Sequence, residues 1–414
     1  MKVNNLQFGV MLLAASLTLG TVSCKKKGCT DETATNYNEE AKKDDGSCTY
    51  EDEPVDANTV LVSGSITSST TWETGKTYVL TSRIAVTNGA TLTIEPGVVV
   101  KGEVGTGANA TALIIARGAD LMAQGTSTQP IIFTTVADEI QPGQIASPNL
   151  DPTMNGLWGG LIVLGYAPIS ADAQAVQIEG IPASDPNGLY GGTDAADNSG
   201  IIRYVSIRHG GANIGEGNEI NGLTLGGVGS GTVIENIEVI GNQDDGVEFF
   251  GGSVNVTNLV LWNIGDDAVD TDQAWSGTLN NFVINGTYDE CFELDGPEGA
   301  MVAGHVIMNG SVNPNGAFGL VDLDANSNLE MINIYFFNVT AGQTFDQLPD
   351  GTGAFTGSNF QITLPGASVI TDFFLGGSDT FVTSVALGAN TVGANVSTFA
   401  GWSWTAVSGA LDEF

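Results

Sequence analysis

An internal repeat of 22 to 23 residues limits the fold of this chain more than any other feature of its sequence. Three successive segments begin with an asparagine, continue into a short apolar run and then reach a pair of acidic residues and a second short run. The leading residues are Asn236, Asn258 and Asn281. Helical solenoid repeats need about 33 residues or more, which is too long for this spacing. The repeat therefore predicts an all-β fold, a right-handed parallel β-helix whose coils of about 22 residues stack on their neighbours.

The composition favours the same architecture and restricts the partners. Glycine accounts for 56 of the 414 residues, and only 14% of the residues are charged, against about 25% in typical globular proteins. A composition rich in glycine and β-branched residues is typical of strands and turns. The formal net charge is −35, from 47 acidic and 12 basic residues. Such a charge repels nucleic acids and favours cation binding, so we expect a monomer without a nucleic-acid partner.

Alignment of the repeats assigns a place to each column of side chains. Alternation along a strand puts Ile237, Leu259 and Phe282 in the core and their neighbours outside. The leading asparagines should form a ladder at a turn, in which each side chain bonds the backbone of its neighbour.

Weaker copies of the repeat flank these three coils. They lie at 204–207 and 320–324, and the period fades after Gly342. We expect a loop at 345–358 and a cap over the open stack around Trp402. Polar loops should be inserted between earlier coils, at 138–155 and 182–199.

Carboxylates dominate two outward rows of the predicted stack. The first row is Glu248, Asp270, Glu293 and Asp322, and the second is Phe250, Asp272, Asp295 and Asp324. Coils lie about 4.8 Å apart, and stacked like charges destabilise a sheet. Calcium would offset this repulsion, because it binds oxygen ligands at about 2.3–2.6 Å. The sequence therefore predicts a calcium site among the seven carboxylates of the two rows.

Three alternatives to a calcium site remain open. The carboxyl groups can have raised pKa values, can extend into water, or can accept hydrogen bonds from turn backbone. We favour the last role for the acidic pairs that precede the rows, Asp244, Asp245, Asp266 and Asp267. The small residues beside them, Gly246, Ala268 and Cys291, should form a shallow floor next to the acidic wall.

The N-terminus has the layout of a targeting segment. An apolar run at 8–19 is too short to span a bilayer and follows a single lysine, Lys2. The sequence Gly20-Thr21-Val22-Ser23-Cys24 resembles a bacterial lipobox, although Thr21 stands where leucine is usual. The resemblance implies a signal peptide at 1–23, acylation of Cys24, and a basic tether at 24–27 that lies at the membrane surface. An ordinary signal peptide with a chance cysteine is the alternative.

A small cysteine-bounded segment follows at 28–50. Export would place Cys29 and Cys48 in an oxidising compartment, so we expect a disulfide between them. The segment resembles a short GCTD…DDGSC motif of exported Bacteroidota proteins. Its polar side chains suit either a calcium ion or a solvated spacer; they are Asp31, Asn36, Asn38, Asp44 and Asp45. An acidic linker at 51–59 precedes the β-helix at 60–414.

The stretch from about 60 to 340 resembles an uncharacterised group of Bacteroidota right-handed β-helix lipoproteins with pectate-lyase-like architecture. The residues that carry the resemblance are the turn at 92–97, Trp158-Gly159-Gly160 and the coil at 244–250. The resemblance implies the architecture and a lipid anchor in the outer membrane that faces the cell surface. It implies no activity.

Carbohydrate-active β-helices suggest a hydrolase hypothesis. The acidic pairs of the first two repeats resemble the spaced aspartates of polygalacturonase-type glycosidases. However, Asp289-Glu290-Cys291 stands where that family has Gly-His-Gly, and no Arg-x-Lys follows. Asp270 and Asp272 are two residues apart on one strand, about 6.8 Å, which is within the range of an inverting pair. Asp267 is the third candidate catalytic residue.

A polysaccharide lyase would need calcium and a basic residue beside the carboxylates. Only Arg203 and Arg208 are near in sequence, a coil or more away. The two histidines, His209 and His305, are more typical of structural roles, and the sequence has no nucleophile triad, nucleotide loop or zinc-spaced cluster.

We therefore favour a cell-envelope scaffold for binding or adhesion, with a carbohydrate or another surface ligand as its partner. The carbohydrate-active enzyme is the alternative. A binder should show a long uniform face with exposed aromatic side chains such as Phe250, Trp262 and Trp275.

Overall fold

A computed structural model of the chain describes residues 26–49, 57–215, 219–350 and 352–414. The chain divides into two compact units, Met1–Ala57 and Asn58–Phe414. Cys24 and the predicted signal peptide lie outside the described residues, as does most of the predicted linker. Within the described ranges, no helix is long and apolar enough to cross a membrane.

The first unit contains the cysteine-bounded segment. A disulfide joins Cys29 and Cys48, which confirms the predicted pairing. The five polar side chains considered as calcium ligands accept backbone N–H groups within the segment or belong to its turns. This use of their oxygens favours the spacer interpretation over a calcium site.

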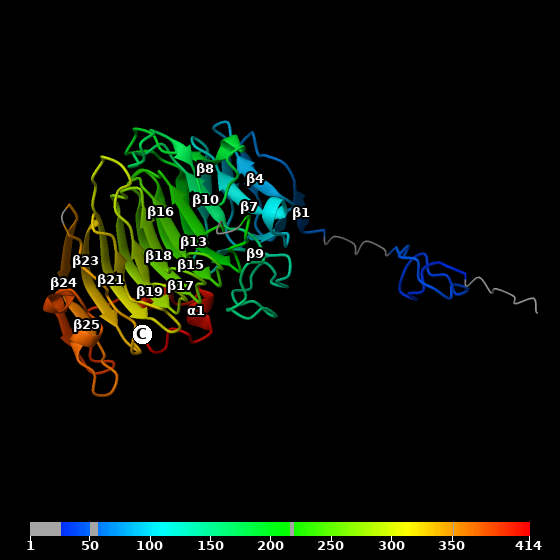
Figure 1. Ribbon diagram of the computed structural model, residues 1–414. Coiled ribbons are helices and arrows are strands. Elements are labelled where there is room, and N and C mark those ends of the chain that lie inside the picture. The colour runs from blue at the N-terminus through cyan, green and yellow to red at the C-terminus, as the bar shows by residue number, and fades with distance from the viewer. Residues whose placement is uncertain (1–25, 50–56, 216–218, 351) are drawn as a thin grey trace, which may run out of the picture. The chain divides into compact units, whose positions relative to one another are not determined.

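The second unit is a stack of coils that contains two large parallel sheets (Figure 1), one of 16 strands and one of 8. The larger sheet consists of β1 (Thr59–Val62), β2 (Thr70–Trp72), β3 (Thr77–Leu80), β5 (Thr91–Ile94), β6 (Val99–Gly102), β8 (Asp120–Gln124), β9 (Ile131–Thr135), β13 (Gly200–Arg208), β15 (Val233–Ile240), β17 (Asn255–Trp262), β19 (Thr278–Asn285), β21 (His305–Asn313), β23 (Asn328–Phe336), β24 (Ala354–Ser358), β25 (Phe360–Ile362) and β26 (Val382–Ser384). The smaller sheet consists of β4 (Arg83–Val86), β7 (Ala112–Ile115), β10 (Leu161–Leu164), β14 (Leu223–Gly226), β16 (Val247–Phe250), β18 (Val269–Asp272), β20 (Phe292–Leu294) and β22 (Asp322–Leu323). The predicted all-β parallel solenoid is confirmed.

Short elements connect or flank the coils. An antiparallel pair, β11 (Val176–Gln177) and β12 (Leu189–Tyr190), lies in a loop outside the smaller sheet. The described helical elements are the 3-10 turns η1 (Gly107–Asn109), η2 (Pro186–Gly188), η3 (Ile370–Asp372), η4 (Ser378–Phe381) and η5 (Val396–Phe399), and the helix α1 (Trp404–Val407).

The register of the larger sheet agrees with the aligned repeats. Ile237 pairs with Leu259, and Leu259 pairs with Phe282. All three side chains are fully buried in one continuous apolar core. This core lies between the sheets because alternate residues of each short strand point inward.

An asparagine ladder bends the long strands of the larger sheet. Asn236, Asn258 and Asn281 have φ of 58°, 61° and 59°, a left-handed conformation that asparagine tolerates better than most residues. Asn258 Nδ2 donates to Asn236 Oδ1 at 2.9 Å, and Asn281 Nδ2 donates to Asn258 Oδ1 at 2.7 Å. The ladder was predicted, but its bonds join side chain to side chain and not side chain to backbone.

The stack continues beyond the point where the sequence period fades. The predicted loop at 345–358 is wrong in part, because β24 pairs with β23 through residues 354–358. Two further strands, β25 and β26, extend the same sheet. The insertions between these last strands conceal the period, although the strands keep the parallel register.

The C-terminal segment, residues 394–414, lies along the outer face of the larger sheet, next to β15, β17 and β19 (Figure 1). Trp402 packs with Val260 and Val283 in a separate apolar cluster. The carboxylate of Glu238 on β15 accepts the backbone N–H groups of Trp404 and Thr405 at 3.1 and 2.8 Å. The predicted location of this segment over the open end of the stack is therefore not observed.

Candidate functional site

The outer side of the smaller sheet carries the acidic rows. Parallel register stacks Glu248 on Asp270, Asp270 on Glu293, and Glu293 on Asp322, as the sequence predicts. We call these four, together with Asp272, Asp295 and Asp324 and the turn residues Asp244, Asp245, Asp266 and Asp267, the acidic face.

Two of the turn carboxylates have the backbone-capping role that we favoured. Asp245 Oδ1 accepts the N–H of Asp267 at 3.1 Å, and Asp267 Oδ1 accepts the N–H of Glu290 at 2.6 Å. Each carboxylate thus binds the equivalent position of the next coil. Both side chains are also buried. Two carboxyl groups therefore lie out of contact with water, next to the outward rows.

Three carboxylates from two coils converge at one point of the acidic face. One oxygen from each of Asp245, Glu248 and Asp270 lies within 4.8 Å of the other two, a spacing that one metal ion could bridge. A second such group joins Asp244, Asp245 and Asp266. The remaining predicted ligands, Asp272, Glu293, Asp295, Asp322 and Asp324, are in neither group among the described residues.

Two oxygens at the first group have no hydrogen-bond partner among the described residues. They are Oδ1 of Asp270 and Oδ1 of Asn221, and both atoms are inaccessible to water. Asn221 is 3% exposed, and its Nδ2 donates to Glu248 Oε2, so its amide lies directly at the group. A buried polar atom without a partner costs about 1–3 kcal/mol, and a bound cation would remove this cost. Carboxylate and amide oxygens are the ligands that calcium prefers, so these residues fit that ion.

Burial and crowding change the acidity of the face. Burial raises the pKa values of Asp245, Glu248 and Asp270 well above their usual range, and neighbouring carboxylates raise them further. The pKa of Asp244 rises to about 7 and that of Asp267 to about 9, again mainly through burial. Full ionisation of all the carboxyl groups on the acidic face is therefore unfavourable unless a bound cation neutralises their charge.

Within the second unit, no basic side chain of the described residues is paired with the acidic face. The second unit contains six lysines and arginines, and each has a partner elsewhere: Lys76 with Glu73, Arg83 with Gly107, Lys101 with Asp138, Arg117 with Gly191, Arg203 with Glu235, and Arg208 with Glu238. The strong base that a lyase would need is thus absent from the described acidic face.

The acidic face is less open than the sequence predicts. Upstream, the same outward column is apolar at Ile114 and Ile162, and the loop at 166–191 covers it with Ile178 and Tyr190. Phe250 belongs to this covered cluster, and Trp275 lies in the core. The prediction that Phe250 and Trp275 are exposed is therefore wrong, and Glu248, next to the cover, is only 5% exposed.

Other predicted features have structural roles. The shallow floor is wrong, because Ala268 and Cys291 pack in the main core and a side chain at Gly246 would meet core residues. His305 packs against Trp275, with the ring planes tilted by 31° and the ring centroids 4.8 Å apart. His209 Nδ1 contacts the carbonyl oxygen of Met154 at 2.7 Å.

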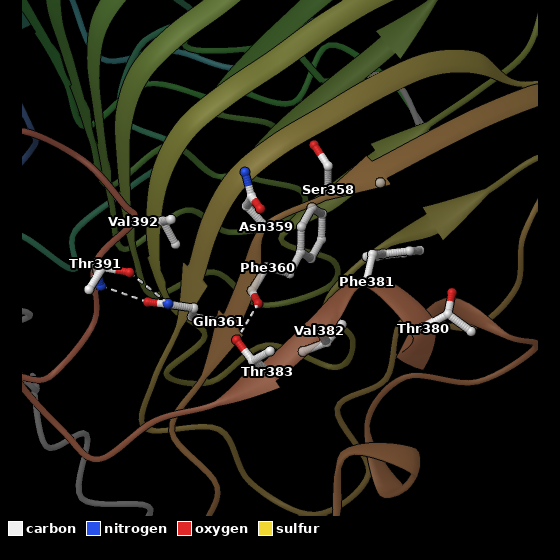
Figure 2. A pocket seen from close by; sticks show the side chains of 11 residues that line it. Ser358, Asn359, Phe360, Gln361, Thr380, Phe381, Val382, Thr383, Thr391 and Val392 are labelled. Atoms are coloured by element: carbon white, nitrogen blue, oxygen red, sulfur yellow. Dashed lines mark hydrogen bonds between the residues drawn. The ribbon is translucent and has the colours of Figure 1, made fainter.

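A hollow of about 560 Å³ at the C-terminal end of the stack has a different character (Figure 2). Its lining contains no titratable side chain. Gln361 faces Thr391: its amide oxygen accepts the backbone N–H of Thr391, and its amide nitrogen donates to the Thr391 hydroxyl. The hollow therefore offers no charged side chain to a ligand, and the acidic face remains the better candidate.

Comparison with protein families agrees with this architecture. The family model described as pectate-lyase like beta helix domain matches residues 64–331. The chain belongs to this family. Searches of curated proteins and of solved structures found no match. Membership of this pectate-lyase-like β-helix family fits a carbohydrate-related function in general terms.

Proposed function

We propose that this pectate-lyase-like β-helix is an envelope-anchored binding scaffold. Its acidic face holds calcium, and the calcium in turn binds an acidic polysaccharide or another carboxylate-bearing surface ligand. The observation that carries the proposal is the group formed by Asp245, Glu248 and Asp270, whose oxygens lie within 4.8 Å of one another. The amide of Asn221 contacts Glu248 and has a buried oxygen without a partner, an atom of the type that calcium takes as a ligand.

Cation bridging reconciles an acidic face with an acidic ligand. With a net charge of −35, the chain repels polyanions in the absence of metal. A divalent ion that retains open coordination positions after binding the protein can accept ligand carboxylates there, because calcium takes six to eight oxygens. Binding of the ligand should therefore require calcium and should weaken as salt is added.

Calcium titration of the full-length protein after chelation tests the metal site. We expect saturable heat and a higher melting temperature. The dissociation constant should be about 10⁻⁴–10⁻³ M, as in extracellular calcium-binding modules. Asp270→Asn should weaken calcium binding at least tenfold, because it removes a charged ligand. Asp322→Asn is the matched control, since Asp322 lies in the same row but outside both carboxylate groups.

The same preparation then tests the ligand. Polygalacturonate should bind in the presence of calcium and be released by chelator, whereas neutral dextran should not bind in either condition. Absence of heat at millimolar calcium, or equal affinity of wild type and Asp270→Asn, would contradict the metal site. Calcium binding without polygalacturonate binding would contradict only the bridged ligand.

An inverting glycoside hydrolase is the second candidate. It is favoured by the separation of carboxyl pKa values on the face: burial raises the pKa of Asp267 to about 9 but that of Asp272 only to about 6. At neutral pH one group then keeps its proton while the other is ionised, as acid and base catalysis requires. Release of reducing ends from polysaccharides that is abolished by both Asp267→Asn and Asp272→Asn would favour this candidate over a binder.

The anchor is part of the proposal, and Cys24 carries it. Cys24→Ala should release the protein from membranes, because acyl chains on this sulfur supply about 0.8 kcal/mol for each buried CH₂. Fractionation of cells followed by blotting measures the change. Cys291→Ala serves as control, because Cys291 is a free core cysteine. A Cys24→Ala protein that remains with the outer membrane would exclude lipidation at this site.

A further inference from the structure

A second pocket lies at the edge of the acidic face, beside the covering loop. Its volume is about 350 Å³. The side chains that line it come from the antiparallel pair β11–β12, the ends of β16 and β18, and the loop after β20; they include Val176, Ile178, Glu179, Tyr190, Phe250, Asp272 and Glu298. Its lining therefore combines apolar and aromatic side chains with three carboxylates.

The hydroxyl of Tyr190 is a polar group available to a ligand in this pocket. Tyr190 is 2% exposed, and its ring is tilted against Phe250 with centroids 5.7 Å apart. Its hydroxyl has no hydrogen-bond partner among the described residues and is not one of the polar atoms closed off from solvent, so it is open to the pocket. Burial is the main cause that raises the pKa of this phenol, and the carboxylates of Asp272, Glu248, Glu298 and Glu179 raise it further; three of these four, all but Glu248, line the pocket.

The spacing of the three carboxylates does not suit a metal ion. Among the described residues, Glu179, Asp272 and Glu298 do not form a group whose oxygens lie within 4.8 Å of one another. The three residues come from three separate segments, and apolar side chains line the same pocket. A pocket of this kind fits a larger cation that has an apolar body, because the ring faces attract positive charge and the apolar walls exclude a hydration shell.

We propose that this pocket binds a protonated primary amine. The ammonium group would donate hydrogen bonds to the Tyr190 hydroxyl and to Asp272, and Glu179 and Glu298 would add charge at the rim. The carbon skeleton of the ligand would lie against Ile178 and Phe250. The two chemical sources of such a group are an aliphatic amine and an amino sugar. This site does not depend on calcium at Asp245, Glu248 and Asp270.

Titration of the full-length protein with n-butylamine tests the site, with n-butanol as the neutral analogue. Chelator is present, so that metal binding cannot contribute. We expect saturable binding of the amine and none of the alcohol. Asp272→Asn and Glu298→Gln should each weaken binding at least fivefold, and Tyr190→Phe about threefold. Asp324→Asn, on the same acidic face but outside the pocket, is the matched control.

A second titration distinguishes an amino sugar from an aliphatic amine as the source of the ammonium group. Glucosamine is compared with N-acetylglucosamine, in which the amine is neutral. Glucosamine affinity above that of butylamine would identify a sugar-borne amine, and the reverse would identify an aliphatic amine; both support the site. Failure of both amines to bind at 10 mM, equal binding of charged and neutral analogues, or unchanged affinity in Asp272→Asn and Glu298→Gln would each overturn it. Calcium titrations of the same variants show whether they remain folded.

Discussion

Glu238→Gln should destabilise the protein by about 3–5 kcal/mol, the range for removing one partner of a buried ion pair. Arg208 and Glu238 are both fully buried, with Arg208 Nη2 3.7 Å from Glu238 Oε2. The guanidinium also lies over the ring of Trp404, 5.0 Å from its centroid. Loss of the carboxylate leaves this cation without its counter-charge beneath the C-terminal segment. Thermal and urea unfolding measure the global effect, and hydrogen exchange of residues 394–414 measures the local one.

The same pair of strands supplies a control for this prediction. Arg203 pairs with Glu235 at 3.3 Å, on the same two strands and ahead of the buried pair in both, but about a third of each side chain is exposed. Glu235→Gln should therefore cost no more than about 1 kcal/mol. Adding Arg208→Met to Glu238→Gln should recover part of the loss, because it removes the unpaired charge. If stability does not recover, the destabilisation comes from loss of the hydrogen bonds that Glu238 accepts from Trp404 and Thr405, and not from the unpaired charge of Arg208.

In calcium-free solution, the melting temperature should fall as the pH rises from about 4 to 9. A carboxyl group whose pKa is higher in the folded state than in the unfolded chain holds its proton more tightly when folded. Its contribution is therefore present at low pH and is lost as the pH rises from the unfolded pKa through the folded pKa. For Asp272 and Asp266 the folded pKa is about 6, for Asp244 about 7, and for Asp267 about 9, against a usual value of 3.8.

The size and reversal of this pH effect can both be measured by calorimetry. One unit of pKa difference corresponds to about 1.4 kcal/mol, and each kcal/mol shifts the melting temperature of a domain of this size by about 2–4 °C. Several such groups together should give a fall of about 5 °C or more. Calcium should reverse it at neutral pH, because it binds the ionised face.

Asp267→Asn provides the control for the pH effect. The asparagine keeps an oxygen for the N–H of Glu290 but cannot ionise, so the pH slope should flatten while the capping bond persists. A melting temperature that rises between pH 4 and pH 7 in chelator would contradict the raised pKa values.

The repeat can be predicted from the sequence because each coil is built from residues that are close together in the chain. Asn236, Asn258 and Asn281 mark equivalent positions, and alternation from each one separates core from surface, so the sequence predicts the columns and the stacking of Glu248 on Asp270. The capping role of Asp245 was also predictable, since a turn aspartate commonly accepts a backbone N–H.

Features that depend on distant segments could not be read in this way. Glu248 is buried because residues 166–191, far upstream, cover its neighbours, and nothing in the strand itself indicates that cover. Tyr190 and Glu298 meet Asp272 in one pocket although about 80 and 26 residues separate them from it in the sequence. Asn221 has an amide at the carboxylate group, yet its position in a loop before β14 resembles an ordinary turn. Glu238 follows the apolar–acidic alternation of a strand that faces water, and its contact Thr405 is 167 residues later.

The docking of the C-terminal segment on Glu238 has a consequence for biosynthesis. A chain that leaves the ribosome with its N-terminus first can stack its coils one after another, since each coil contacts only its neighbours. Arg208 and Glu238 would form their ion pair during this assembly, but they would stay in contact with solvent until residues 394–414 arrive. Residues 394–414 therefore close the outer face of the first coils of the repeat only after those coils have been made. A chain terminated before residue 394 would expose Val260 and Val283 with the charged pair, and cellular proteases could distinguish it from a chain that contains this segment by that surface.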